Sequence, residues 1–256
     1  MMICPKCNFE QADGIPSCAR CGVIFAKLKS SAVWGAHAFD DVEKAYQMIG
    51  RSIAAYERST EVSPFNSRFD TYLKTGNGLT AQEMLGLTLF NGRAKCANCH
   101  TSTADAASGK VLFTDFTYDN LGAPKNPMNP FYSEPEFNPL GASWVDLGLG
   151  GYLKSAGSDV SVYEPELGKF KVPTLRNVDK RPSSGFVKAY GHNGFFKSLE
   201  EIVHFYNTRD VPEVGWPAPE YAANMNTSEV GNLGLTPAEE EAIVAFLKTL
   251  TDTRFP

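Results

Sequence analysis

Two cysteines and a histidine at residues 96–100 form the pattern in this chain with the most specific chemistry. The segment reads Cys96-Ala97-Asn98-Cys99-His100, so two thiols are separated by two residues and followed directly by an imidazole. This spacing is the attachment signature for c-type haem, in which each thiol adds to one vinyl group and the histidine faces the iron. The signature is short, so a zinc half-site or a reducible dithiol remains an alternative at this point.

Four further cysteines lie close to the N-terminus. Cys4 and Cys7 form one Cys-x2-Cys pair, and Cys18 and Cys21 form a second. Two such pairs can supply the four thiolates of a tetrahedral structural zinc site. A segment this small buries little apolar surface, so metal would supply most of its stability. We therefore predict a zinc-ribbon-like module over residues 1–30, with a redox or disulfide role as the alternative.

Composition limits the classes of partner. The chain has 256 residues, enough for one large domain with an appendage, and its formal net charge of −5 argues against a nucleic-acid-binding surface. No apolar run is long enough to span a bilayer. The N-terminal residues lack the basic start and apolar core of a signal peptide. Because haem c is normally attached outside the bacterial cytoplasm, the sequence contains a conflict over location.

Capping residues and helical periodicity predict the elements that position these groups. We expect one helix from a cap at Asp40 to Tyr56, a second from Thr80 into the Cys-x2-Cys-His segment, and a last helix from Thr236. Residues 101–170 lack helical periodicity and are rich in proline, glycine and aromatic residues. This composition predicts a long ordered loop, which either wraps around a haem face or simply packs. The fold class is therefore mainly α with long ordered loops.

Another short helix is predicted to begin at Ser198. On it, Leu199, Ile202, Val203 and Tyr206 recur at helical spacing and share one face. Tyr206 therefore lies on the inward side of this helix.

From Trp34 to the C-terminus, the sequence resembles the C-terminal haem domain of bacterial di-haem cytochrome c peroxidases, and especially of their MauG-like relatives. Several blocks in the same order carry the resemblance: residues 53–58, 79–90, 96–100, 172–178, 191–194 and 199–201. The resemblance implies a cytochrome c-like helical domain, which we assign to residues 33–256. It also implies that Cys96 and Cys99 attach the haem and that His100 is its proximal ligand.

The resemblance further suggests the second iron ligand. The typical peroxidases carry a methionine on the short helix, whereas MauG-like members carry a tyrosine, and Tyr206 lies at this position. The alternative is a tyrosine that is buried for packing with its hydroxyl hydrogen-bonded. Met128 and Met225 are also ligand candidates, but the loops that contain them do not match the family's ligand segment.

Two more residues are site candidates. His192 is predicted to be an acid–base group beside the haem pocket, or equally a loop residue that hydrogen-bonds the backbone. Arg176 is predicted to pair with a haem propionate, because a guanidinium suits a carboxylate; an ordinary surface ion pair is the alternative. In the family, calcium lies between two haem domains. A calcium site is doubtful here, because the chain has one haem motif.

Together, the motif and the resemblance predict a c-type haem oxidoreductase that links one covalent haem to hydrogen peroxide. The implied partner is a small electron-donor protein, such as a cytochrome c or a cupredoxin, or a protein substrate. The resemblance implies a periplasmic location, and a homodimer is one assembly to test. Two alternatives stay open: a non-enzymatic monohaem electron-transfer cytochrome c, and a zinc-binding interaction module.

Overall fold

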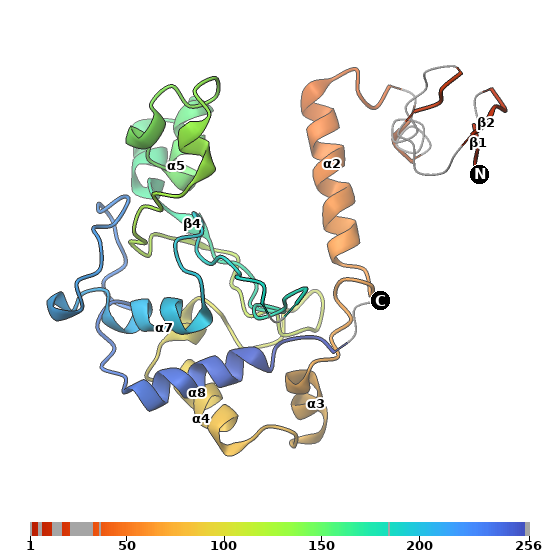
Figure 1. Ribbon diagram of the computed structural model, residues 1–256. Helices are drawn as coiled ribbons and strands as arrows, with labels where there is room; N and C mark the ends of the chain where they lie inside the picture. Colours follow the sequence, from red (N-terminus) through yellow and green to blue (C-terminus); the bar gives the residue numbers. More distant parts are fainter. Residues whose placement is uncertain are drawn as a thin grey trace. The chain divides into compact units, whose positions relative to one another are not determined.

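A computed structural model describes residues 2–4, 7–11, 17–20, 33–35, 37–183 and 185–253 and divides the chain into two compact units. Unit 1 comprises residues 1–64 and 255–256, and unit 2 comprises residues 65–254 (Figure 1). The predicted boundary between residues 30 and 33 lies among residues outside the described ones, so it stays a prediction. No helix in the described part of the chain is both long and apolar enough to cross a membrane.

Unit 1 contains a small hairpin and one long helix. Its elements are β1 (Met2–Ile3), β2 (Glu10–Gln11) and α2 (Val42–Glu57), and the two strands pair antiparallel. The cap of α2 is Asp41, whose carboxylate accepts a hydrogen bond from the backbone N–H of Lys44. The predicted cap was therefore wrong by one residue. Asp40 instead lies 2.6 Å from Nδ1 of His37.

Unit 2 is rich in helices, and its few strands are short. Its α-helices are α3 (Arg68–Thr75), α4 (Ala81–Asn91), α5 (Gly148–Ser155), α6 (Val160–Tyr163), α7 (Leu199–Thr208) and α8 (Pro237–Lys248). Short 3-10 helices are η1 (Cys96–Asn98), η2 (Pro130–Ser133), η3 (Gly141–Ser143), η4 (Glu164–Glu166) and η5 (Pro212–Val214). Strands β3 (Tyr118–Asp119) and β4 (Phe170–Lys171) pair antiparallel. The prediction of a mainly helical protein is confirmed.

Local capping signals begin three of these helices where the sequence predicted. Thr80 begins α4 and Thr236 begins α8, each through a reciprocal capping box with the glutamate three residues later. Ser198 begins α7 by accepting a hydrogen bond from the N–H of Glu201. Each of these caps involves two residues that are three positions apart in the chain, so the sequence alone predicts where the helix begins.

Helices α5 and α6 correct the prediction that residues 101–170 form only a loop. Gly148 and Gly150 lower the helix propensity of α5, which explains why the sequence does not predict it. The structure requires both glycines, since a Cβ at Gly148 would overlap the backbone of Lys169, and one at Gly150 would overlap the backbone of Leu167. Close packing against this neighbouring segment therefore outweighs propensity.

Four phenylalanines form the centre of the core of unit 2. The Phe113 ring lies 5.1 Å from that of Phe69, 5.7 Å from that of Phe90 and 5.9 Å from that of Phe246 between ring centroids. All four side chains are buried. They join α3, α4 and α8 to the loop that follows the Cys-x2-Cys-His segment.

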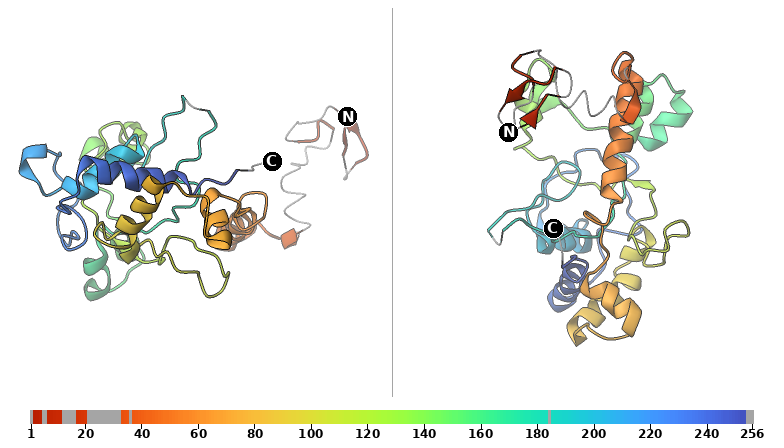
Figure 2. Two further views of the ribbon diagram at one scale, coloured as in Figure 1. Left: turned by 90° about the horizontal axis from the view of Figure 1, so that it is seen from below. Right: turned by 90° about the vertical axis from the view of Figure 1, so that its right-hand side faces the viewer.

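Helices α4 and α8 lie side by side, as Figures 1 and 2 both show. Gly86 allows their close approach. A Cβ at this position would overlap the carbonyl of Ala242 and lie 2.8 Å from Cβ of Phe246. The crossing therefore depends on a residue without a side chain.

Replacing Gly86 with alanine should destabilise unit 2 by about 1–3 kcal/mol, the usual cost of overpacking. This loss should appear although alanine is the better helix former by about 1 kcal/mol. Gly50→Ala in α2 is the matched control, because no atom lies within 4 Å of its Cβ position, and it should not lower stability. Urea unfolding followed by circular dichroism measures both variants. A Gly86→Ala protein as stable as the wild type would contradict the close helix crossing.

Candidate haem site

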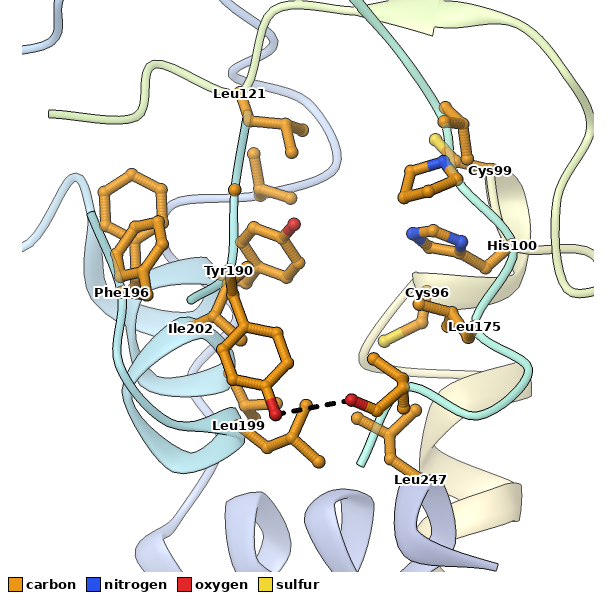
Figure 3. Close-up of a pocket in the computed structure, with 18 of the residues that line it drawn as sticks. Cys96, Cys99, His100, Leu121, Leu175, Tyr190, Phe196, Leu199, Ile202 and Leu247 are labelled. Atoms are coloured by element: carbon orange, nitrogen blue, oxygen red, sulfur yellow. Dashed lines mark hydrogen bonds between the residues drawn. The ribbon is translucent and has the colours of Figure 1, made fainter. Parts of the chain in front are cut away.

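Unit 2 contains a largely apolar cavity of about 540 Å³ beside the Cys-x2-Cys-His segment. Figure 3 shows Cys96, Cys99 and His100 on one wall, with Tyr190 and Ile202 on the facing wall. The volume falls in the range of roughly 300–1,000 Å³ that is typical of pockets for small molecules and cofactors. The cavity is therefore the candidate functional site.

His100 is oriented by a backbone carbonyl. Its Nδ1 lies 2.9 Å from the carbonyl oxygen of Phe113, and this oxygen only accepts, so Nδ1 carries the proton. The other nitrogen, Nε2, carries no proton and keeps its lone pair. This is the arrangement found in metal-binding histidines. Burial lowers the pKa of His100, and this effect exceeds the opposite one of the hydrogen bond to Phe113 and the charge of Asp115. The imidazole is therefore neutral near pH 7, as a metal ligand must be.

Cys96 and Cys99 are free, protonated thiols that line the cavity. Burial raises the pKa of Cys96 to about 12. Burial, and then the carboxylate of Glu229, raise the pKa of Cys99 to about 12 as well. Oε2 of Glu229 lies 3.9 Å from Sγ of Cys99. Protonated thiols can add across a carbon–carbon double bond, whereas a metal binds the thiolate and must displace the proton.

Tyr206 lines the cavity from α7, together with Leu199, Ile202 and Val203 of the predicted helix face. Within the described ranges, no group forms a hydrogen bond with its hydroxyl. Burial raises the pKa of Tyr206 strongly, so the phenol is neutral. A tyrosine hydroxyl in an apolar cavity usually has a partner, so this one is available to a ligand.

The two methionines considered as ligands lie elsewhere. Met128 is 80% exposed. Met225 packs against Gly122. Neither is among the residues that line the cavity.

Arg176 also lines the cavity, and its side chain is 7% exposed. Its Nη2 donates to the carboxylate of Asp70 and lies 3.5 Å from Oδ1 of Asp252. Its Nε and Nη1 are buried and have no hydrogen-bond partner in the described structure. Buried guanidinium nitrogens without a partner are expensive, so an acidic group of a ligand that reached them would stabilise the site.

His192 lies at the edge of the same cavity. Its ring stacks on Phe170 with a centroid distance of 3.6 Å and an interplanar angle of 8°. Its Nε2 lies 3.3 Å from Oε2 of Glu220. Burial lowers the pKa of His192, and Glu220 opposes this effect only in part.

In unit 1, the described N-terminal cysteines come together. The Sγ atoms of Cys4, Cys7 and Cys18 all lie within 4.8 Å of one another, and those of Cys7 and Cys18 are 3.6 Å apart. The hairpin β1–β2 brings the first pair into this position, with the N–H of Cys4 donating to the carbonyl of Phe9. Cys21 lies outside the described residues.

Sequence reasoning missed several residues that contact site residues, among them Phe113, Glu220 and Asp70. No sequence pattern near Phe113 or Glu220 predicts their contacts, because each contacts a histidine that is distant in the chain. Asp70 had a signal, since Ser67 and Asp70 form the capping box of α3. That pattern predicts the helix but does not predict the contact with Arg176.

Comparison with known proteins identifies relatives over most of the chain, although no protein-family model matches. The chain is 34% identical over 236 residues to methylamine utilization protein MauG of Paracoccus denitrificans (strain Pd 1222), covering 88% of the chain and 56% of the relative. It is 29% identical over 232 residues to cytochrome-c peroxidase IdrP2 of Pseudomonas sp. (strain SCT), covering 86% of the chain and 52% of the relative. The chain thus spans about half the length of the curated relatives it matches.

A solved structure also resembles the chain. The crystal structure of the diheme peroxidase BthA from Burkholderia thailandensis E264 matches with a TM-score of 0.69 and 31% sequence identity. The match covers 89% of this chain and 56% of that one. The similarity therefore includes the backbone as well as the sequence.

Replacing Asp70 with asparagine should destabilise unit 2 by about 3 kcal/mol at pH 7, as loss of one partner of a buried ion pair does. Burial alone would raise the pKa of Asp70, but hydrogen bonds from Arg176 and Ser67 hold this pKa below its usual value. The stabilisation is therefore full above the unfolded-state pKa of about 4 and is lost as pH falls through the lower folded pKa. Urea unfolding at a series of pH values measures the difference between wild type and variant.

The control for this prediction is Glu200→Gln, which breaks the exposed pair between Lys248 and Glu200. Exposed pairs contribute about 0–1 kcal/mol, so this variant should resemble the wild type. An Asp70→Asn protein that matches the wild type at pH 7 would show that the buried pair does not stabilise the fold.

Proposed function

Because the chain belongs to the di-haem cytochrome c peroxidase/MauG family, we propose that unit 2 is an oxidoreductase domain that binds one c-type haem covalently. One observation carries this proposal. Cys96, Cys99 and the free nitrogen of His100 line a single cavity of suitable size and polarity. We also propose a periplasmic location, because c-type haem is normally attached outside the bacterial cytoplasm.

The residues around the cavity fit a haem. In this assignment the S–H groups of Cys96 and Cys99 add across the two vinyl groups, each sulfur bonding one carbon while its hydrogen goes to the other. His100 supplies Nε2 to the iron. The unpaired Nε and Nη1 of Arg176 meet a propionate. When bound, the haem supplies one-electron redox chemistry that no side chain of the cavity has.

We assign the second iron ligand to Tyr206. Two observations support this assignment. The hydroxyl of Tyr206 has no hydrogen-bond partner among the described residues, and Tyr206 lies on the face of α7 that lines the cavity. Burial keeps the phenol protonated, so the positive charge of the iron would replace that proton. A phenolate ligand stabilises ferric iron relative to a thioether and would lower the reduction potential.

The proposed reaction is reduction of hydrogen peroxide, or oxidation of a protein substrate, with electrons carried through the haem. The names of the relatives support this reaction class. A small redox protein, such as a cytochrome c or a cupredoxin, is the proposed electron donor. His192 is the proposed acid–base group at the edge of the cavity.

A second candidate function is electron transfer without peroxide chemistry. His100 and Tyr206 both line the cavity, and in this assignment both would be bound to the iron. In that case peroxide could bind only after one ligand leaves. Turnover of peroxide with a reduced cytochrome donor separates the two candidates.

We further propose that unit 1 binds zinc through Cys4, Cys7 and Cys18, with Cys21 as the fourth ligand. The three described sulfurs are close enough to share one ion. Such a site would be structural, because four cysteine ligands leave no open position on the metal.

The haem assignment predicts one c-type haem per chain, measured by pyridine haemochrome absorption. The full chain should be produced with an added export signal in a host that has haem c attachment machinery. Elemental analysis of the same sample should find one iron and one zinc per chain. The double variant Cys96→Ser, Cys99→Ser should lose covalent haem, and its matched control Cys4→Ser, Cys7→Ser should lose zinc and keep haem. Folded wild-type protein without covalent haem would contradict the assignment.

The ligand assignment predicts that Tyr206→Phe opens a coordination position on the iron. Cyanide should then bind at least about tenfold more tightly, since each 1.4 kcal/mol is tenfold in affinity. Tyr190→Phe is the matched control, because Tyr190 lines the same cavity but donates to the carbonyl of Val178 at 3.3 Å. Ferric absorption spectra and cyanide titrations measure both. An unchanged ferric spectrum in Tyr206→Phe would remove Tyr206 from the coordination sphere.

A further inference from the structure

Glu220 is a buried carboxylate at the edge of the cavity that forms no ion pair with a lysine or arginine in the described structure. Its side chain is 3% exposed. It accepts hydrogen bonds from the backbone N–H of Asp146 at 3.2 Å and from Nδ2 of Asn193 at 3.0 Å. His192 is its one ion-pair partner among the described residues. A buried carboxylate needs a cation, and a histidine can become one by binding a proton.

His192 is held in place from two other directions. The ring of Phe170 stacks flat against it. Its loop turns tightly at Gly191 and Gly194, whose φ values of 78° and 69° suit glycine. The carboxylate of Glu220 can only accept a hydrogen bond, so Nε2 of His192 is the donor. Neutral His192 therefore carries its proton on Nε2 and keeps a lone pair on Nδ1.

Other titratable and charged groups surround the pair. The charge of Asp146, like that of Glu220, raises the pKa of His192 against the larger, opposite effect of burial. Burial, followed by Glu220 and Asp146, raises the pKa of Tyr132, so this phenol stays neutral. Lys125 lies over the Tyr132 ring at 4.9 Å.

Lys171 follows Phe170 in β4, but its ammonium lies over the Phe116 ring at 4.8 Å. The lysines near the pair are thus engaged with aromatic rings. His192 is the group that can change its charge near neutral pH.

We propose that Glu220 is a positioning residue that prepares His192 for proton uptake linked to haem reduction. This inference rests on the proposed haem function. With the haem bound, Nδ1 of His192 would take one proton from water as the donor protein supplies one electron to the site, and the ring would become an imidazolium. When that electron is passed on, the proton would return to water. The added negative charge in the cavity and the carboxylate of Glu220 both favour the imidazolium.

The test is the pH dependence of the haem midpoint potential in the full, haem-loaded chain. One proton per electron means a tenfold change in the reduction equilibrium per pH unit, or about 59 mV for a one-electron couple. The wild-type potential should fall with this slope between the pKa values of His192 in the oxidised and reduced protein. His192→Gln should abolish the slope. Glu220→Gln should move the sloping range to lower pH by at least one unit, because His192 loses its anionic partner.

The chain supplies a matched control in a second histidine–glutamate pair. Nδ1 of His204 lies 3.1 Å from the carboxylate of Glu240, but His204 is 43% exposed and does not line the cavity. His204→Gln should therefore keep the wild-type slope. In ¹⁵N NMR spectra of the histidine rings, neutral wild-type His192 should be protonated at Nε2, and Glu220→Gln should weaken this preference.

Each outcome decides between the two proposals. A slope that persists in His192→Gln, or neutral wild-type His192 protonated at Nδ1, would overturn the role of the pair. A wild-type potential independent of pH in haem-loaded protein would also overturn it while leaving the proposed function intact. Folded protein without covalent haem would overturn the proposed function, and this inference with it.

Discussion

The hydrogen bond from His100 to the carbonyl of Phe113 joins the candidate site to the core. Phe113 has a φ of 53°, in the left-handed region, which costs a residue other than glycine about 1–3 kcal/mol. Its ring is fully buried against three other phenylalanines, and aromatic pairs contribute about 0.5–1.5 kcal/mol each beyond burial. The core packing can therefore hold the strained backbone, and this backbone directs the carbonyl at Nδ1. Helices α3, α4 and α8 thus help to fix the imidazole through one peptide group.

Burial has the same consequence for four titratable groups of the cavity, although it moves their pKa values in opposite directions. It raises the pKa of Cys96, Cys99 and Tyr206 and lowers that of His100, so all four are neutral. Arg176 keeps its charge, which Asp70 and Asp252 compensate. A largely apolar cavity with these four neutral groups and a partly unpaired guanidinium suits an apolar ligand that carries a carboxylate. This argument is independent of the sequence similarity.

The parts that sequence predicted are those that depend on neighbours along the chain. The caps of α4 and α8 and the inward face of α7 each involve residues three or four positions apart. The parts it missed depend on distant contacts. His100 and Phe113 are 13 residues apart, and His192 and Glu220 are 28 apart. Helix α5 was missed for a related reason, since Gly150 is required by the backbone of Leu167 and not by the helix that contains it.

The three Cys-x2-Cys pairs share one spacing, and their surroundings favour different chemistry. In unit 1, Cys4, Cys7 and Cys18 lie together, so thiolates there can share the charge of one metal ion. Cys99 instead has Asp119 and Glu229 as neighbours, whose negative charges oppose a thiolate. Addition to a vinyl group keeps the proton in the product and creates no charge, so it is compatible with these carboxylates. The electrostatic environment, which the motif does not encode, therefore differs between the two places: three sulfurs lie together in unit 1, whereas Cys99 lies beside two carboxylates.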